Sequence, residues 1–367
     1  MNARTIVLQL SLIDGVGPAT IAKISAVLGT ADATWLSLST MTVSALVDRF
    51  QIGRALAQKI EHGLQDTTLV SRELKLIRTH AINWITILEP EYPALLRHIH
   101  IPPPVLYWQG NSLSLLSASA VAMIGSRKAN QYGQRVINRL VPPLVRHGYT
   151  IVSGGAIGAD TMVHRAVVEH KGITIVVLGS GLLRPYPREN SRLFKEVMAC
   201  GGAIMSIFPL MTEPVPGNFP VRNRVIAGLS QACVVVQAAA RSGTAITATY
   251  ALEQGRNVFA VPGPIDDELS VGCHALIKEG ATVCTDVADI IGEYAEQTYT
   301  VTQKTEIQEC TPAGSQDSLV IWCAVPRSMD ELVILSGAPF SAIQDKLFEL
   351  QLQGLISQDF AGMWTAR

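Results

Sequence analysis

Four apolar runs between residues 121 and 263 decide the fold of this chain: VAMIG at 121–125, IVSGGAIGAD at 151–160, ITIVVLGSGL at 173–182 and ACVVVQAAARSGT at 232–244. Each run begins with a short, charge-free and largely β-branched segment, which is typical of a parallel strand buried on both faces. Helix-length segments such as YGQRVINRLVPPLVRHG at 132–148 separate the runs. This alternation predicts an open, doubly wound α/β sheet whose ligands lie outside the carboxyl ends of the strands.

The turns after the first two strands are suited to holding phosphate. A guanidinium such as that of Arg127 can bind a phosphate through two parallel hydrogen bonds. The glycine-rich turn at 153–160 precedes a helix, where exposed backbone N–H groups attract anions. The glycine spacing does not fit G-x-G-x-x-G and the turn has no Walker lysine, so the signal is the pair of turns on adjacent strands. The candidate phosphate-binding residues here are Gly125, Ser126, Arg127, Ser153, Gly154 and Gly155.

Later turns add cations at the starts of helices. Asn190 can cap the helix that follows it, which places Arg192 in the first turn of that helix. A cation there opposes the helix dipole unless an anion is bound, and the same argument applies to the arginines of NFPVRNRVIAGLS at 218–230. The hydroxyl groups after the last strand can either join an anion site or act as ordinary N-caps. The candidates from these turns are Asn190, Arg192, Arg222, Asn223, Arg224, Ser242, Gly243 and Thr244.

The charge of the chain is unevenly distributed. Its net charge is −1 over 367 residues, but residues 121–230 hold 13 Lys and Arg against 5 Asp and Glu, and residues 261–310 hold 2 against 10. The basic block predicts an anionic partner at the sheet. No charge-free apolar run reaches the ~20 residues of a membrane span, and residues 1–17 lack a signal-peptide cleavage site, so we expect a soluble, cytoplasmic protein. The six scattered cysteines indicate buried thiols, with neither metal nor cofactor expected.

The main domain is expected at 71–292, with strands at Trp84–Leu88 and Val105–Trp108 and smaller segments on either side. Residues 1–70 are expected to be helical, and LIDGVGPATIAKISAVLG at 12–29 resembles a helix-hairpin-helix. That hairpin could bind a DNA phosphate or serve protein contacts. Residues 293–314 form the predicted linker. Residues 315–367 predict three helices and two short strands, and the third helix is too acidic to favour groove reading.

Five motifs resemble those of the DNA-processing protein A family (DprA, also called Smf): IGSR at 124–127, SGGAIGAD at 153–160, YPRENSRL at 186–193, GNFPVRNRVIAGLS at 217–230 and SGTAITATYALEQGRNVFAVPG at 242–263. The resemblance implies an extended Rossmann-like fold that binds single-stranded DNA in a basic pocket and forms a homodimer through that domain. It also implies loading of the RecA recombinase during natural transformation. The N-terminal segment is similar to helix-hairpin-helix or SAM-like modules, and the C-terminal segment to a winged helix.

Two positions depart from the family pattern, because Ile207 and Gln237 stand where glutamates are usual. The alternative function is that of a nucleotide-cleaving phosphoribohydrolase-type enzyme, whose chemistry needs a carboxylate near the sugar. Only Asp160 and Glu253 remain as candidates for that carboxylate. We therefore expect a DNA-binding protein and not an enzyme, while a pure protein scaffold would show no DNA binding at all.

Overall fold

The computed structural model describes residues 2–111, 119–240, 242–298, 318–323, 327–336, 338–358 and 363–366. The chain forms two compact units, Met1–Glu296 and Gln297–Arg367. Each unit is described by itself. Within the described parts, no helix is both long enough and apolar enough to pass through a membrane.

A nine-stranded sheet in the order β1-β2-β6-β5-β4-β3-β7-β8-β9 forms the centre of the first unit. All neighbours from β6 to β9 pair in parallel, whereas β1 and β2 form an antiparallel edge. The Rossmann-like α/β fold predicted from the apolar runs is confirmed. The strands are β1 (Asn83–Thr86), β2 (Val105–Gly110), β3 (Ala120–Ile124), β4 (Thr150–Ser153), β5 (Thr174–Leu178), β6 (Ala203–Ser206), β7 (Ala232–Val235), β8 (Asn257–Ala260) and β9 (Thr282–Val283).

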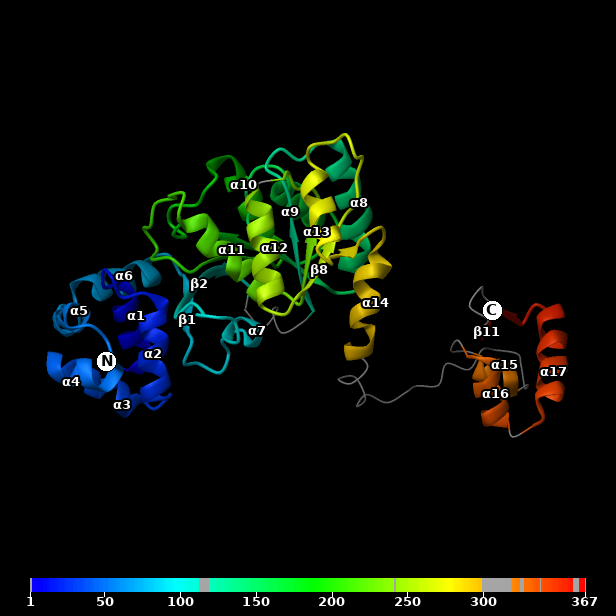
Figure 1. Ribbon diagram of the computed structural model, residues 1–367, viewed down its shortest axis with the longest axis horizontal. Helices are drawn as coiled ribbons and strands as arrows, with labels where there is room; N and C mark the ends of the chain where they lie inside the picture. Colours follow the sequence, from blue (N-terminus) through cyan, green and yellow to red (C-terminus); the bar gives the residue numbers. More distant parts are fainter. Residues whose placement is uncertain are drawn as a thin grey trace. The chain divides into compact units, whose positions relative to one another are not determined.

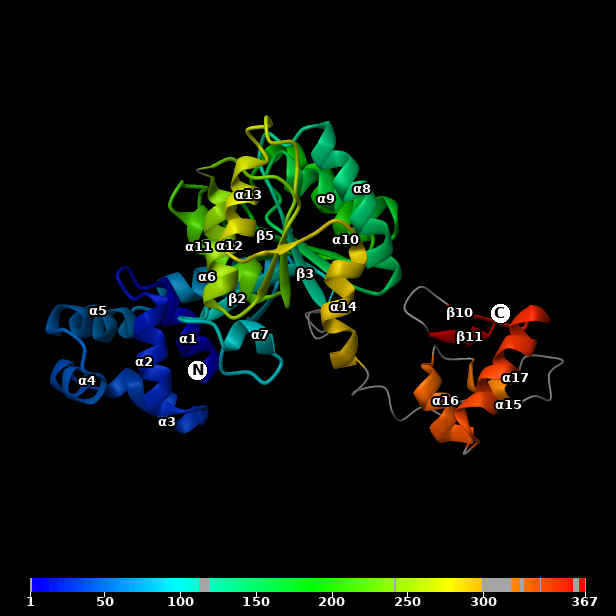
Figure 2. The same cartoon turned by 45° about the vertical axis from the view of Figure 1, so that its right-hand side comes forward.

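Helices cover both faces of the sheet, as Figures 1 and 2 show. Alternate residues of β3 enter different cores, because Val121 packs with α8, α9 and α14 while Ala122 packs with α11, α12 and α13. This alternation follows from the two-residue period of a strand. The helices are α8 (Gln131–Arg146), α9 (Ala159–Glu169), α10 (Ser191–Ala199), α11 (Asn218–Gly228), α12 (Gly243–Glu253), α13 (Val271–Lys278) and α14 (Val287–Thr298).

The N-terminal helices pack against the antiparallel edge of the sheet (Figure 1). They share one hydrophobic core with residues of β2, β5, β6 and α10. Gly15 has φ +85° and Pro18 begins α2, as the predicted hairpin requires. Tyr92 and Tyr107 are buried packing residues near this edge. The helices are α1 (Ala3–Leu12), α2 (Pro18–Leu28), α3 (Asp32–Leu36), α4 (Val43–Phe50), α5 (Arg54–Gln65), α6 (Thr68–Thr79) and the short α7 (Ala94–Arg97).

The residues of the second unit that the structure describes from 318 onward form three helices and a two-stranded antiparallel sheet, in the order that the sequence predicts. Leu347 of α17 and Trp364 of β11 lie in its small core. Its identity as a winged helix stays a prediction. Of the predicted linker at 293–314, the first part continues α14 to residue 298, and residues 299–314 lie outside the described residues. The elements are α15 (Ser318–Trp322), α16 (Met329–Ser336), α17 (Phe340–Leu352), β10 (Ile356–Gln358) and β11 (Trp364–Ala366).

Candidate functional site

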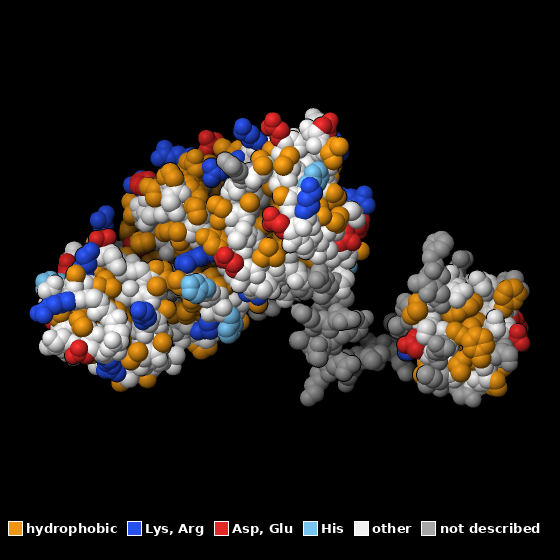
Figure 3. All heavy atoms as spheres, viewed as in Figure 1, with side chains coloured by type: hydrophobic (Ala, Val, Ile, Leu, Met, Phe, Trp, Pro, Cys, Tyr) orange, Lys and Arg blue, Asp and Glu red, His pale blue; other side chains and the backbone are white. Residues whose placement is uncertain are grey.

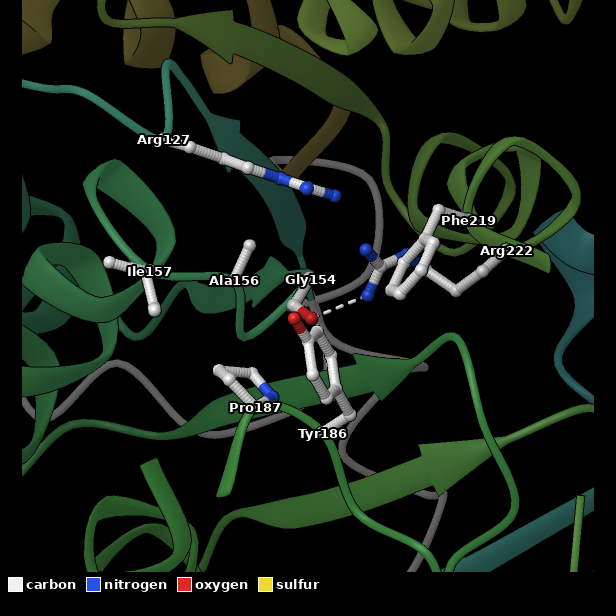
Figure 4. A pocket seen from close by; sticks show the side chains of 8 residues that line it. All are labelled: Arg127, Gly154, Ala156, Ile157, Tyr186, Pro187, Phe219 and Arg222. Carbon is white, nitrogen blue, oxygen red and sulfur yellow. Dashed lines mark hydrogen bonds between the residues drawn. The ribbon is translucent and has the colours of Figure 1, made fainter. Parts of the chain in front are cut away.

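A pocket opens at the carboxyl ends of β3, β4 and β5. The strand order reverses between β3 and β7, so the pocket lies on the β4 side of the topological switch point of the sheet. The pocket is partly open to solvent, and Figure 4 shows the side chains around it. It is lined by Arg127, Gly154, Ala156, Ile157, Tyr186, Pro187, Phe219 and Arg222.

Two arginines and two aromatic rings converge in this pocket. The guanidinium carbons of Arg127 and Arg222 lie 5.3 Å and 5.9 Å from the centre of the Phe219 ring. The rings of Tyr186 and Phe219 are 5.9 Å apart and tilted by 59°. Figure 4 shows Arg127 reaching across the pocket toward Phe219, and Figure 3 shows basic and hydrophobic side chains side by side over α10 and α11. Such a surface offers cations for phosphate and π-faces for stacking.

Arg222 forms the inner wall of the pocket and is only 4% exposed. Its Nη1 donates to the backbone oxygens of Gly154 and Val177, and its Nε donates to Oδ1 of Asn223 over 3.0 Å. Burial lowers the pKa of Arg222 to about 10, and Asp160 opposes that shift. The guanidinium therefore stays charged at neutral pH.

Asp160 lies near Arg222, and the two side chains influence each other's charge. Burial raises the pKa of Asp160, whereas Arg222 and the Ala156 N–H, which donates to Oδ2 over 3.2 Å, lower it. A Cβ on Gly154 would lie 2.7 Å from Asp160 Oδ2 and 2.8 Å from Arg222 Cζ. Gly154 thus leaves room for these two side chains.

Several other predicted site residues stabilise the turns from inside. Ser153 is fully buried, and its Oγ donates to the oxygen of Met123 over 2.7 Å, which joins β4 to β3. Gly155 has φ +70°, a conformation that favours glycine. Gly125 is packed so closely that a Cβ would lie 2.7 Å from Cβ of Ala159. Ser126 lies beside it, with its backbone N–H donating over 2.8 Å to the oxygen of Gln237 at the end of β7.

The prediction that Asn190 caps α10 is wrong. In the described structure its side chain makes no capping hydrogen bond. Asn190 is buried, and its Nδ2 donates to the oxygen of Gly155 over 2.9 Å and to Oγ1 of Thr161 over 2.7 Å. Because these buried acceptors need a donor, Asn190 ties the loop after β5 to the glycine-rich turn.

Arg192 and Arg224 lie apart from the pocket lining that the structure describes. The Arg192 side chain is 92% exposed, and its Nε lies 2.8 Å from Oε1 of Glu196, one turn further along α10. This neighbour offsets the unfavourable first-turn position of the cation. Burial lowers the pKa of Arg224, whereas the hydroxyl groups of Tyr250 and Tyr92 raise it.

The turn before α12 lies next to α11. Nδ2 of Asn223 donates to the oxygen of Gly243 over 3.4 Å, so the start of α12 is joined to the middle of α11. Thr244 is buried, and Ser242 Oγ is a buried atom with no hydrogen-bond partner among the described residues. The N-cap alternative therefore fails for Ser242, which precedes α12 without capping it.

Sequence reasoning missed five residues that line the pocket. Ala156 and Ile157 belong to the glycine-rich turn, and Tyr186, Pro187 and Phe219 belong to motifs that were singled out for their arginines and asparagines. The available signal was an aromatic residue next to a proline in both YPRENSRL and GNFPVRNRVIAGLS. Apolar residues held in a turn at a strand's carboxyl end are unusual unless they meet a ligand.

Together, this pocket and the parallel sheet define a Rossmann-like α/β protein with a cationic, aromatic site. The model of the family described as DNA recombination-mediator protein A matches residues 83–295, which contain this pocket. The chain belongs to that family.

Curated relatives agree with this assignment. The chain is 40% identical over 265 residues to DNA processing protein DprA of Bacillus subtilis, covering 72% of this chain and 88% of the relative. It is 37% identical over 272 residues to Protein Smf of Escherichia coli, covering 72% of each.

Two solved structures are similar. The X-ray structure of DprA from Streptococcus pneumoniae has a TM-score of 0.68 at 32% identity and covers 80% of this chain and 99% of its own. A structure of DprA from Helicobacter pylori, described as showing a unique single-stranded DNA binding mode, has a TM-score of 0.53 at 27% identity and covers 59% and 96%.

Proposed function

We propose that this protein is a single-stranded DNA-binding recombination mediator. It would protect incoming single-stranded DNA and help to load the RecA recombinase during natural transformation, acting in the cytoplasm as a homodimer joined through the Rossmann-like domain. Support comes from the family match and from the H. pylori relative, whose description names single-stranded DNA binding.

The observation that carries the proposal is the exposed guanidinium of Arg127 beside the Phe219 ring. A single strand presents alternating phosphates and unpaired bases, and a protein binds it with cations and stacking platforms. In a duplex the bases are stacked inside, so an aromatic pocket wall would have no base face to meet. The pocket chemistry therefore favours single strands over duplexes.

The predicted site residues divide into two proposed roles. Arg127 is exposed and meets the strand directly, with Phe219 and Tyr186 beside it. Arg192 is exposed at α10 and would meet the strand further along its path. The others shape the turns that carry these groups: Gly125, Ser126, Ser153, Gly154, Gly155, Asn190, Arg222, Asn223, Arg224, Ser242, Gly243 and Thr244.

A non-catalytic role fits the positions of the two candidate carboxylates. Asp160 is 8% exposed and faces Arg222, so it is held by the protein's own cation. Glu253 ends α12 ten residues after Gly243, which is roughly 15 Å along the helix at 1.5 Å per residue. Release of free base from a panel of nucleoside monophosphates would contradict this reading and favour the phosphoribohydrolase-type enzyme.

The function is tested by titrating a fluorescent oligo-dT and following its anisotropy. Arg127→Ala is expected to weaken binding by about 10- to 100-fold, since a hydrogen bond to a charged group contributes about 1.5–3 kcal/mol. Arg192→Ala is expected to weaken it less, because Glu196 already competes for that cation. The control is Arg139→Ala on α8, where Nη2 lies 2.9 Å from Asp286 Oδ2. Equal affinity of Arg127→Ala and the wild type would refute the proposed site.

A further inference from the structure

Two loops that follow neighbouring strands carry the aromatic wall of the pocket. Residues 179–187 follow β5 and bring Tyr186 and Pro187 to the site. Residues 207–217 follow β6 and lead into α11, whose second residue is Phe219. The relative position of the two rings therefore depends on how these loops are held.

Backbone hydrogen bonds join the two loops to each other. The Gly181 N–H donates to the oxygen of Thr212 over 2.9 Å, and the Leu183 N–H donates to the oxygen of Leu210 over 3.0 Å. Gly181 lies against the backbone of Pro209 and Leu210 so closely that a Cβ would overlap both carbonyl oxygens. A displacement of one loop would therefore displace the other.

A carboxylate from the N-terminal helices holds this pair of loops. Glu73 of α6 is 6% exposed, and its Oε1 accepts the Leu210 N–H over 2.8 Å. Leu210 itself is fully buried in the core that the N-terminal helices share with β5 and β6. Both the backbone and the side chain of this loop residue are thus fixed by the helical segment.

The helical segment is itself attached firmly to the sheet edge. The guanidinium of Arg4 on α1 lies 3.8 Å from the centre of the Trp84 ring on β1, and its Nε lies 3.3 Å from Oε1 of Glu89. Figure 1 shows α1 and α6 at the side of the sheet formed by β1 and β2. Glu73 can therefore act as a fixed point.

Burying a carboxylate at this position costs desolvation free energy. Burial raises the pKa of Glu73, and the Leu210 N–H opposes that shift. An apolar side chain would avoid the desolvation but would leave the Leu210 N–H without its partner. The carboxylate is thus suited to fixing the loop at one point.

We propose that Glu73 is a positioning residue for the pocket and that the N-terminal helices serve as the scaffold that sets its aromatic wall. The inference rests on the proposed function. Glu73 makes no direct contact with the DNA strand in this proposal, because it acts through the backbone of Leu210.

The test compares three variants of the full chain. Glu73→Ala removes the acceptor, and we expect oligo-dT affinity to fall about 5- to 10-fold as the fraction of correctly placed loop decreases. Glu73→Gln keeps an oxygen acceptor and is expected to stay within about twofold of wild type. The control is Glu61→Ala on α5, which removes a carboxylate that accepts the Val43 N–H over 3.1 Å within the helices and away from the loops.

A second measurement follows the loops without DNA. Amide hydrogen exchange across residues 207–217 is expected to accelerate in Glu73→Ala and to stay unchanged in Glu61→Ala and Glu73→Gln. Unchanged affinity and exchange in Glu73→Ala would overturn the inference while leaving the proposed function intact. Equal losses in Glu61→Ala would also overturn it, since the effect would be one of stability alone. Absence of oligo-dT binding by the wild type would remove the proposed function, and the exchange data would then decide the loop contact separately.

Discussion

Replacing Arg222 with methionine tests the hydrogen bonds that its guanidinium makes beneath the pocket. The substitution keeps an unbranched side chain of similar length but removes the donors to the backbone oxygens of Gly154 and Val177. A buried acceptor left without its donor costs about 1–3 kcal/mol, so the loss of the donors to two carbonyl oxygens should destabilise the protein by about 2–6 kcal/mol. We expect a loss of that size in the free energy of unfolding of the first unit.

The assay is urea unfolding followed by circular dichroism, with Arg165→Met as the control because Arg165 is an exposed arginine on α9. The control is expected to change stability by no more than about 0.5 kcal/mol. Adding Asp160→Asn to Arg222→Met should recover part of the loss, since Arg222 favours the charged form of Asp160, and the coupling should reach about 1–3 kcal/mol. Strict additivity of the two substitutions would refute the electrostatic coupling between Arg222 and Asp160.

Two further predictions concern buried polar groups, one on α9 and one in the turn after β7. Burial lowers the pKa of His164 from 6.5 to about 3, so in this pH range the unfolded state binds a proton that the folded state does not. The free energy of unfolding should therefore decrease by about 1.4 kcal/mol for each pH unit as the pH falls from 6.5 to 3. His164→Gln should flatten that part of a pH-dependent urea series, and an unchanged slope would contradict the assignment. Gln237 Nε2 donates to Asn130 Oδ1 over 3.0 Å and lies 3.4 Å from Asp267 Oδ2. Gln237→Glu removes this donor and places a carboxylate beside the two oxygens, so stability at pH 7 should fall by about 1–3 kcal/mol. A thermal midpoint equal to that of the wild type would rule this out.

The parallel strands of the sheet could be predicted because burial on both faces demands continuous apolar runs. VAMIG and ACVVVQA became β3 and β7, neighbours at the centre of the sheet. The meeting of the turns at one edge followed from the parallel arrangement alone. Arg127, Gly154 and Arg222 do line one pocket there.

Side-chain partners could not be predicted, because they depend on contacts between distant parts of the chain. Asn190 is a residue type that commonly caps helices, but its amide nitrogen donates to Gly155 and Thr161 instead. Arg222 was interpreted as a cation that faces something negative, whereas its guanidinium is buried and donates to the backbone oxygens of Gly154 and Val177. Phe219 was overlooked because its contact with Arg127 joins α11 to the turn after β3.

The salt dependence of oligo-dT binding tests the central claim most directly, because it counts the phosphates that the protein neutralises. Each phosphate contact on a single strand contributes about −0.7 to the slope of log K against log salt. We predict a steep negative slope for the wild type and a slope shallower by about 0.7 for Arg127→Ala. Identical slopes for the two proteins would show that Arg127 meets no phosphate, and the account of the pocket as a single-strand site would be contradicted.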